Sequence, residues 1–173
     1  MKAARIPAAF VVIATVFVAL AAPIAAQHDP SGHGGHHAAV DARGANVMGF
    51  DQARTVHHFH LYENGGAIDV AVKDAADVGD RDAIRQHLPH IARMFTDGRF
   101  DAPMLVHDIE VPGTPELTRL KTAVRYSYVE TPGGGRVDIV TTHPEALAAV
   151  HRFLAFQIAD HRTGDALTVG RRP

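Results

Sequence analysis

Apolar and polar residues alternate in two pairs of segments along the chain. In the first pair, Thr55–Tyr62 and 67–72 alternate on either side of the sequence Asn-Gly-Gly. In the second pair, 122–130 and 136–141 flank a proline and three glycines. A period of two is typical of a strand with one buried face, and a short Gly-rich connection is typical of a hairpin. The pattern therefore predicts two β-hairpins.

Apolar residues at helical spacing follow each predicted hairpin. Within 80–96 the apolar stripe consists of Ile84, Leu88, Ile91 and Phe95. This stripe predicts an amphipathic helix that Pro89 kinks or divides into two short ones. A second helix is expected over 142–161, because a Thr-x-x-Glu capping box with proline at the first helical position begins it. Between the two halves, 104–111 could form a short strand and 114–117 a helical turn.

These elements predict an α+β fold built from a duplicated ββα unit. The two hairpins would form one four-stranded antiparallel sheet, with both helices packed on one face. Successive side chains of a strand point to opposite faces, so the alternation also predicts which residues face the helices. The inward set is Phe59, Leu61, Ile68, Val70, Val72, Val124, Tyr126, Tyr128, Val137 and Ile139. The outward set is His58, His60, Asp69, Arg125, Ser127 and Asp138. His57 is expected to face the core side.

The chain ends are expected to differ from this domain. Residues 1–26 have the pattern of a cleaved signal peptide: basic residues, an apolar run, then small residues. The apolar run is shorter than the roughly 20 residues that span a bilayer, so no membrane span is expected after cleavage. Residues 27–46 lack an apolar period and are expected to form a flexible tail. One domain over 47–165 and a C-terminal tail over 166–173 would complete a periplasmic or secreted protein.

Composition narrows the chemistry that this domain could perform. The chain contains 13 His and no Cys, which excludes disulfides, thiolate metal sites and cysteine nucleophiles. The formal net charge of -2 argues against nucleic acid as a partner, because phosphate binding needs a basic surface. Neither serine lies in a GxSxG motif, and the Gly-rich turn joins two strands rather than a strand and a helix. Catalysis would therefore depend on a bound metal.

Two groups of histidines are the main candidate metal ligands. His58 and His60 stand two positions apart on the first predicted strand, so both imidazoles project from one face, about 7 Å apart. Met48, His107 or Asp69 could supply a third ligand. The predicted tail adds His28, His33, His36 and His37. Imidazole and thioether ligands suit copper, with zinc next. Alternatively, solvent-facing strand positions and a polar tail simply tolerate histidine.

Histidines on the predicted helices allow other interpretations. The first helix carries a stripe that could bind copper or fill the core: His87, His90 and Met94. On the second helix, His151 and His161 could contact an organic ligand or act as axial donors to haem. The alternative is that His151 is a core residue bonded to a carbonyl or carboxylate. Phe153 and Phe156 widen the apolar surface of this helix, which is consistent with a homodimer contact.

Together these patterns favour an exported, non-catalytic metal-binding protein that handles or traffics copper. The tail histidines would capture the ion, and His58 and His60, with Met48 or His107, would hold it. A small-ligand or haem-binding α+β domain, with its pocket near His151, is the first alternative. A metal-assisted enzyme that uses the polar sheet face is the second. The sequence does not decide whether the protein is an enzyme, but it favours binding.

Overall fold

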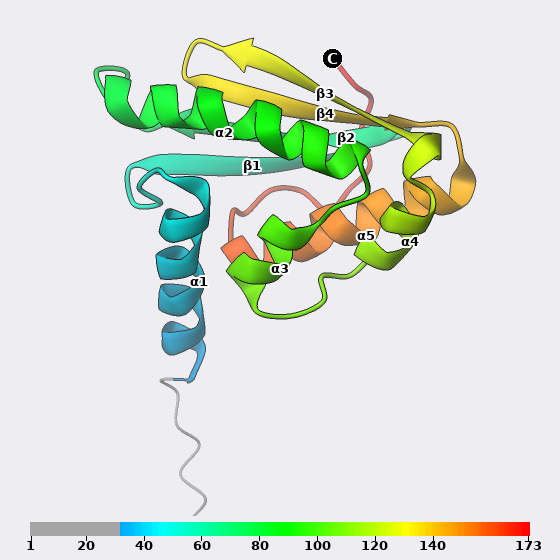
Figure 1. Ribbon diagram of the computed structural model, residues 1–173, viewed down its shortest axis with the longest axis horizontal. Coiled ribbons are helices and arrows are strands. Elements are labelled where there is room, and N and C mark those ends of the chain that lie inside the picture. Colours follow the sequence, from blue (N-terminus) through cyan, green and yellow to red (C-terminus); the bar gives the residue numbers. More distant parts are fainter. Residues whose placement is uncertain (1–31) are drawn as a thin grey trace, which may run out of the picture.

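A four-stranded antiparallel sheet forms the centre of the protein (Figure 1). The computed structural model describes residues 32–173, without the side chains of 32–34, 36 and 37. The strands are β1 (Thr55–Tyr62), β2 (Gly65–Val72), β3 (Val124–Thr131) and β4 (Gly134–Thr141). Their order in the sheet is β1-β2-β4-β3, so the two hairpins join through β2 and β4. This arrangement confirms the expected α+β class and the antiparallel sheet. The expected signal peptide lies outside the described residues.

Five helices in the described part of the chain accompany this sheet. They are α1 (Gly32–Met48), α2 (Val78–Thr96), α3 (Asp101–His107), α4 (Thr114–Arg119) and α5 (Pro144–His161), and a 3-10 turn over Lys121–Ala123 precedes β3. The helices α2 and α5 pack directly against the strands, whereas α1 packs mainly on α3, and α4 on α5. Leu88 of α2 packs over Gly135 of β4, and Leu154 of α5 packs over Gly66 of β2. Each long helix lies mainly on the hairpin that it does not follow in sequence. The element order β-β-α occurs twice, but a duplicated unit is not confirmed and stays a prediction.

Burial follows the alternation of the strands. Nine of the ten residues predicted to face the helices are buried: Phe59, Leu61, Ile68, Val70, Val72, Val124, Tyr126, Val137 and Ile139. Tyr128 is only partly buried and packs at the margin of the core. The outward positions are exposed or half-buried. A period of two was therefore enough to assign the two faces.

The N-terminal helix α1 is the largest departure from expectation. Residues 27–46 were expected to be flexible, but the chain is helical from Gly32 to Met48. Val40 of this helix is 1% exposed, and the Arg43 Nε donates a hydrogen bond to the Val106 carbonyl oxygen at 2.7 Å. A Gly-rich helix of this length has little stability alone, so contact with α3 must hold it. The ordered domain thus begins earlier than residue 47.

Two shorter expectations also need correction. Pro89 does not divide the first long helix, because α2 continues from Val78 to Thr96 with Pro89 inside it. The buried side chains of Leu88 and Ile91 hold both sides of this position against the sheet, which offsets the lost hydrogen bond. Residues 104–111 do not form a strand; the first four of them belong to α3, whose C-cap Asp108 has a left-handed conformation. The expected helical turn at 114–117 is α4.

The C-terminal segment covers the open edge of β1. Gly170 N–H donates to the Leu61 carbonyl oxygen at 2.9 Å, and Glu63 N–H donates to the Gly170 carbonyl oxygen at 3.0 Å. Arg172 then reaches the Gly66 and Ile139 carbonyl oxygens, both at 3.0 Å. An uncovered edge strand could pair with another chain, and this segment protects it. Among the helices described, none has the length and apolar character needed to cross a membrane.

Candidate functional site

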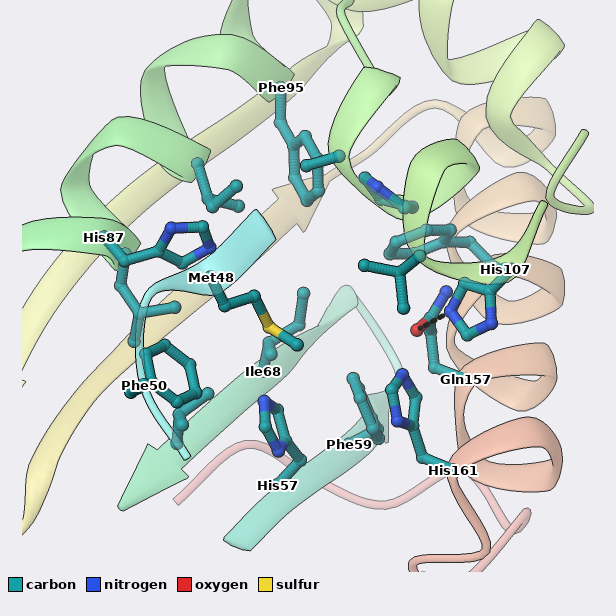
Figure 2. Close-up of a pocket in the computed structure, with 17 residues that line it drawn as sticks. Met48, Phe50, His57, Phe59, Ile68, His87, Phe95, His107, Gln157 and His161 are labelled. Carbon is teal, nitrogen blue, oxygen red and sulfur yellow. Dashed lines mark hydrogen bonds between the residues drawn. The ribbon is translucent and has the colours of Figure 1, made fainter. Parts of the chain in front are cut away.

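An apolar pocket lined by four histidines lies between β1, β2 and the helices (Figure 2). It encloses a cavity of about 70 Å³. Its polar and sulfur-containing lining residues come from five elements: Met48 (α1), His57 (β1), His87 (α2), His107 (α3), and Gln157 and His161 (α5). Aromatic and aliphatic side chains, including Phe50, Phe59 and Ile68, form the remaining wall. We call this site the histidine pocket.

His57 is the most unusual residue of the histidine pocket. It points inward because it shares the face of β1 that carries Phe59, and its ring centroid lies 5.9 Å from Phe50 and 5.6 Å from His161. Its Nε2 atom is buried and has no hydrogen-bond partner among the residues that the structure describes. Burial lowers the pKa of His57 to about 3, and the neighbouring His161, His87 and His58 add to this effect. The imidazole is therefore neutral at physiological pH, the state required of a metal ligand.

His87 is a second neutral imidazole of the pocket. Burial lowers its pKa to about 4, with a further contribution from His90 on the same helix. Its ring packs edge-on against Phe50, with the ring centroids 5.8 Å apart. Phe50 thus lies against both His57 and His87. The apolar wall keeps these two imidazoles uncharged.

His107 is held in place at both ring nitrogens. It is 2% exposed; its Nδ1 lies 2.6 Å from the Asp160 Oδ2 atom, and its Nε2 lies 3.0 Å from the Gln157 Oε1 atom. A carboxylate bonded to one imidazole nitrogen fixes the orientation of the ring. The Gln157 Nε2 atom is buried and has no hydrogen-bond partner within residues 32–173 as described. His107 and Gln157 therefore form a rigid wall beside His161, whose ring centroid is 4.9 Å from that of His107.

Met48 enters the pocket from the C-terminal end of α1. Gly49 follows it with a φ of 77°, a conformation that glycine adopts without strain, and the chain turns there toward β1. This turn directs the flanking Met48 and Phe50 into the pocket. Figure 2 shows the thioether pointing into the space bordered by His57 and Phe59. The order of α1 is therefore what delivers a sulfur atom to the histidines.

The structure divides the residues that sequence analysis proposed as ligands. Met48, His107 and His161 all line the histidine pocket. His58 and His60 lie on the opposite face of the sheet, with ring centroids 6.4 Å apart. His33, His36 and His37 belong to α1, but their side chains lie outside the described residues. The proposed strand set of His58, His60, Met48 and His107 therefore does not share one site.

His151 occupies a different environment from the pocket histidines. Its Nε2 lies 2.9 Å from the Tyr62 carbonyl oxygen and 3.1 Å from the Gly65 carbonyl oxygen. The imidazole thus ties α5 to the turn between β1 and β2, as a core histidine bonded to carbonyls would. Of the phenylalanines considered for a homodimer contact, Phe153 is buried in the core and Phe156 packs against His107.

His57 and Gln157 were not among the site residues predicted from the sequence, and His87 was considered only in a stripe with His90 and Met94. A signal was present, because His57 lies on the inward side of a strand and His87 and His161 border the apolar stripes of their helices. A search limited to histidines on the predicted core-facing sides of strands and helices would have identified most of the histidines that line the pocket. Among the described residues, no three His, Asp or Glu side chains form a ready metal site. Met48 adds a sulfur donor to the histidines of this lining.

Comparisons with known proteins assign neither a family nor a function to this chain. No protein-family model, curated protein or solved structure matches this chain. The chemistry of the histidine pocket therefore carries the functional argument.

Proposed function

We propose that this protein binds copper(I) in the histidine pocket, with Met48, His57 and His161 as ligands and without catalysis. The observation that carries this proposal is the buried, unpartnered Nε2 atom of His57 beside a thioether. An unpaired buried polar atom costs roughly 1 to 3 kcal/mol, so folding gains nothing from it. A bound ion would satisfy this nitrogen and account for its position.

The chemistry of the donors favours copper(I) over zinc. Thioether sulfur is a soft ligand that suits copper(I), and neutral imidazole binds it as well. A monovalent ion also carries less charge into an apolar cavity than a divalent one. Zinc usually takes four nitrogen, sulfur or carboxylate ligands, and the residues described here provide no group of three His, Asp or Glu. The histidine pocket thus fits a low-coordinate soft ion better than zinc.

The spacing of the two imidazoles is compatible with one shared ion. The ring centroids of His57 and His161 are 5.6 Å apart and the ring planes are 11° apart, so one imidazole must rotate before both rings can direct a nitrogen at one ion. Metal–nitrogen bonds of about 2 Å place the centroids of two coordinating imidazoles roughly 5 to 6 Å apart. The flexible Met48 side chain can then complete the set by a change of rotamer. His87 and His107 would border the ion without being needed as ligands.

Pocket size weighs against the haem alternative. Its cavity of about 70 Å³ is far smaller than the roughly 300 to 1,000 Å³ of pockets that hold drug-sized ligands. Of the two histidines considered for haem, His161 lines this pocket and His151 does not. Hydroxyl and carboxyl side chains are also missing from the described lining, which favours binding over catalysis. Export remains our proposal for the cellular context, with His28 and the α1 histidines His33, His36 and His37 as the first point of ion capture.

Copper(I) titration under anaerobic conditions, against a chromogenic chelator, tests this proposal. Met48→Leu should weaken binding at least tenfold, and the copper–sulfur distance in X-ray absorption spectra should disappear. Met94→Leu is the matched control, because Met94 is buried in the core but does not line the pocket. Both changes conserve side-chain volume, so neither should unfold the protein. Equal affinity and an unchanged sulfur signal in Met48→Leu would overturn the proposal.

A second variant separates binding from folding. His57→Leu removes the unpartnered Nε2 atom and should abolish high-affinity copper(I) binding. The free energy of unfolding of the metal-free protein should stay equal or rise, because an unsatisfied buried polar atom is lost. Urea denaturation of the metal-free form measures the second effect. A stable His57→Leu protein that still binds copper(I) like the parent would contradict the role of His57.

A further inference from the structure

The outer face of the sheet carries a second arrangement of histidines. His58 and His60, which we call the outer-face pair, have side chains that are 47% and 37% exposed. The His58 Nδ1 atom lies 2.8 Å from the Asp165 Oδ1 atom. The His60 Nε2 atom lies 3.1 Å from the Asp69 Oδ2 atom. Each imidazole therefore contacts a carboxylate through one nitrogen, and within the described part of the chain the other nitrogen makes no hydrogen bond.

Other groups hold both carboxylates in position. Asp165 accepts a hydrogen bond from the Thr163 hydroxyl at 2.7 Å and from the Phe59 N–H at 2.8 Å. Asp69 accepts one from the Arg136 Nε at 2.7 Å. Metal-binding histidines commonly donate their second N–H to such a carboxylate, which fixes the tautomer and makes the ligating nitrogen more basic. This supporting hydrogen bond is already formed at His58, whereas His60 meets Asp69 as an ion-pair contact.

We propose that the outer-face pair binds a divalent cation of borderline softness, of the Zn²⁺ or Cu²⁺ class, with water completing the coordination. His58 would ligate through Nε2 and His60 through Nδ1, the nitrogens opposite those that contact Asp165 and Asp69. Their ring centroids are 6.4 Å apart, slightly beyond the roughly 5 to 6 Å expected for two imidazoles on one ion. Small rotations of two exposed side chains close this difference. Two protein ligands and open solvent give weak, exchangeable binding.

The outer-face pair lies directly behind the histidine pocket. His57 and His58 are consecutive on β1 and point to opposite faces of the sheet. The partners of these two histidines are also close in sequence. His161, at the end of α5, stacks on His57, and Asp165, four residues after His161, contacts His58. The same strand and the same helix end therefore support both sites. This inference nevertheless stands on the carboxylate contacts and does not require copper(I) in the pocket.

Calorimetric titration with Zn²⁺ tests the outer-face site. The parent for this test is the full chain with His28, His33, His36 and His37 replaced by alanine, so that the tail does not compete. Alanine favours helix, so these changes should not weaken α1. We expect one exchangeable Zn²⁺ ion with micromolar affinity. His58→Ala and His60→Ala should each weaken binding at least tenfold, and Asp165→Asn by about tenfold.

Matched variants decide between this site and other interpretations. His90→Ala, which removes an exposed histidine of α2, should leave Zn²⁺ affinity unchanged. His58→Gln keeps a donor for Asp165 but should lose Zn²⁺ binding, which separates ligation from folding. Equal Zn²⁺ affinity in the parent and in the His58→Ala/His60→Ala double variant would overturn the inference. Loss of Zn²⁺ binding in Met48→Leu alone would also overturn it, because the ion would then occupy the histidine pocket.

Discussion

The two faces of β1 place neighbouring histidines in opposite environments. His57 points into an apolar pocket, where burial lowers its pKa to about 3 and its Nε2 atom has no hydrogen-bond partner in the described structure. His58, one residue later, is 47% exposed and contacts Asp165. Both are candidate ligands, but one would suit a soft, monovalent ion and the other an exchangeable divalent ion. The side of the strand, rather than the number of histidines, determines what each can bind.

The largest expected effect concerns His107 on the helix-covered side of the sheet. It measures how much the polar contacts of this buried side chain contribute to the free energy of unfolding. His107→Leu should lower the free energy of unfolding by about 3 kcal/mol. The substitution removes the buried imidazole and with it the contacts to Asp160 and Gln157. Urea denaturation at neutral pH measures this change, and circular dichroism checks that the fold is retained. A loss below about 0.5 kcal/mol would mean that these contacts contribute no more than ordinary surface contacts.

The second-largest expected effect is on the stability of the protein in acid, to which the buried His87 contributes. The pKa of His87 is lowered to about 4, whereas the ordinary value is 6.5. Between these pH values the unfolded chain binds a proton that the folded protein does not, so stability falls as the pH falls through this window. Replacing His87 removes this contribution. His87→Leu should therefore lose less stability between pH 7 and pH 4 than the parent, by on the order of 2 kcal/mol.

Urea denaturation of metal-free protein at several pH values checks this expectation. The curve of unfolding free energy against pH should be flatter for His87→Leu, with the difference confined to the range below pH 6.5. His57 would still contribute a slope of the same sign, because its pKa is also lowered. Parallel curves for the two proteins would show that His87 is not shielded from solvent as its packing against Phe50 indicates.

The smallest effect concerns the outer face and completes the comparison with His107. His58→Leu should change the free energy of unfolding by less than about 1 kcal/mol, because an exposed ion pair contributes little. Asp165 keeps its bonds to the Thr163 hydroxyl and the Phe59 N–H in this variant. The measurement is the same urea titration. A loss as large as that of His107→Leu would contradict the distinction between a buried and an exposed histidine–carboxylate pair.

Much of the fold could be predicted from local patterns. The alternation over Thr55–Tyr62 coincides with β1, and the predicted inward residues are buried with the exception of Tyr128. Strand alternation and helical spacing are properties of a few consecutive residues, so they are readable without the partner elements. The helix α1 was missed for the opposite reason. Its order depends on Val40 and Arg43 contacting α3, about sixty residues away in sequence.

The candidate site was predictable only in part. Met48, His107 and His161 were chosen as separate candidates, and the structure brings them into one pocket with His57 and His87. Spacing along the chain could not show this, because the pocket joins five elements that meet only when the sheet, α1, α3 and α5 have packed. His58 and His60 were correctly placed on one outward face, but their carboxylate Asp165 comes from the segment after α5.

By itself, the sequence determined the secondary-structure periods, the two faces of the sheet and the absence of thiol chemistry. These follow from local backbone geometry and residue type. Only the tertiary structure decided which histidines meet, because His57 and His161 become neighbours through the packing of α5 across β1. It also decided their charge, since the burial that keeps His57 and His87 neutral is produced by residues from distant parts of the chain.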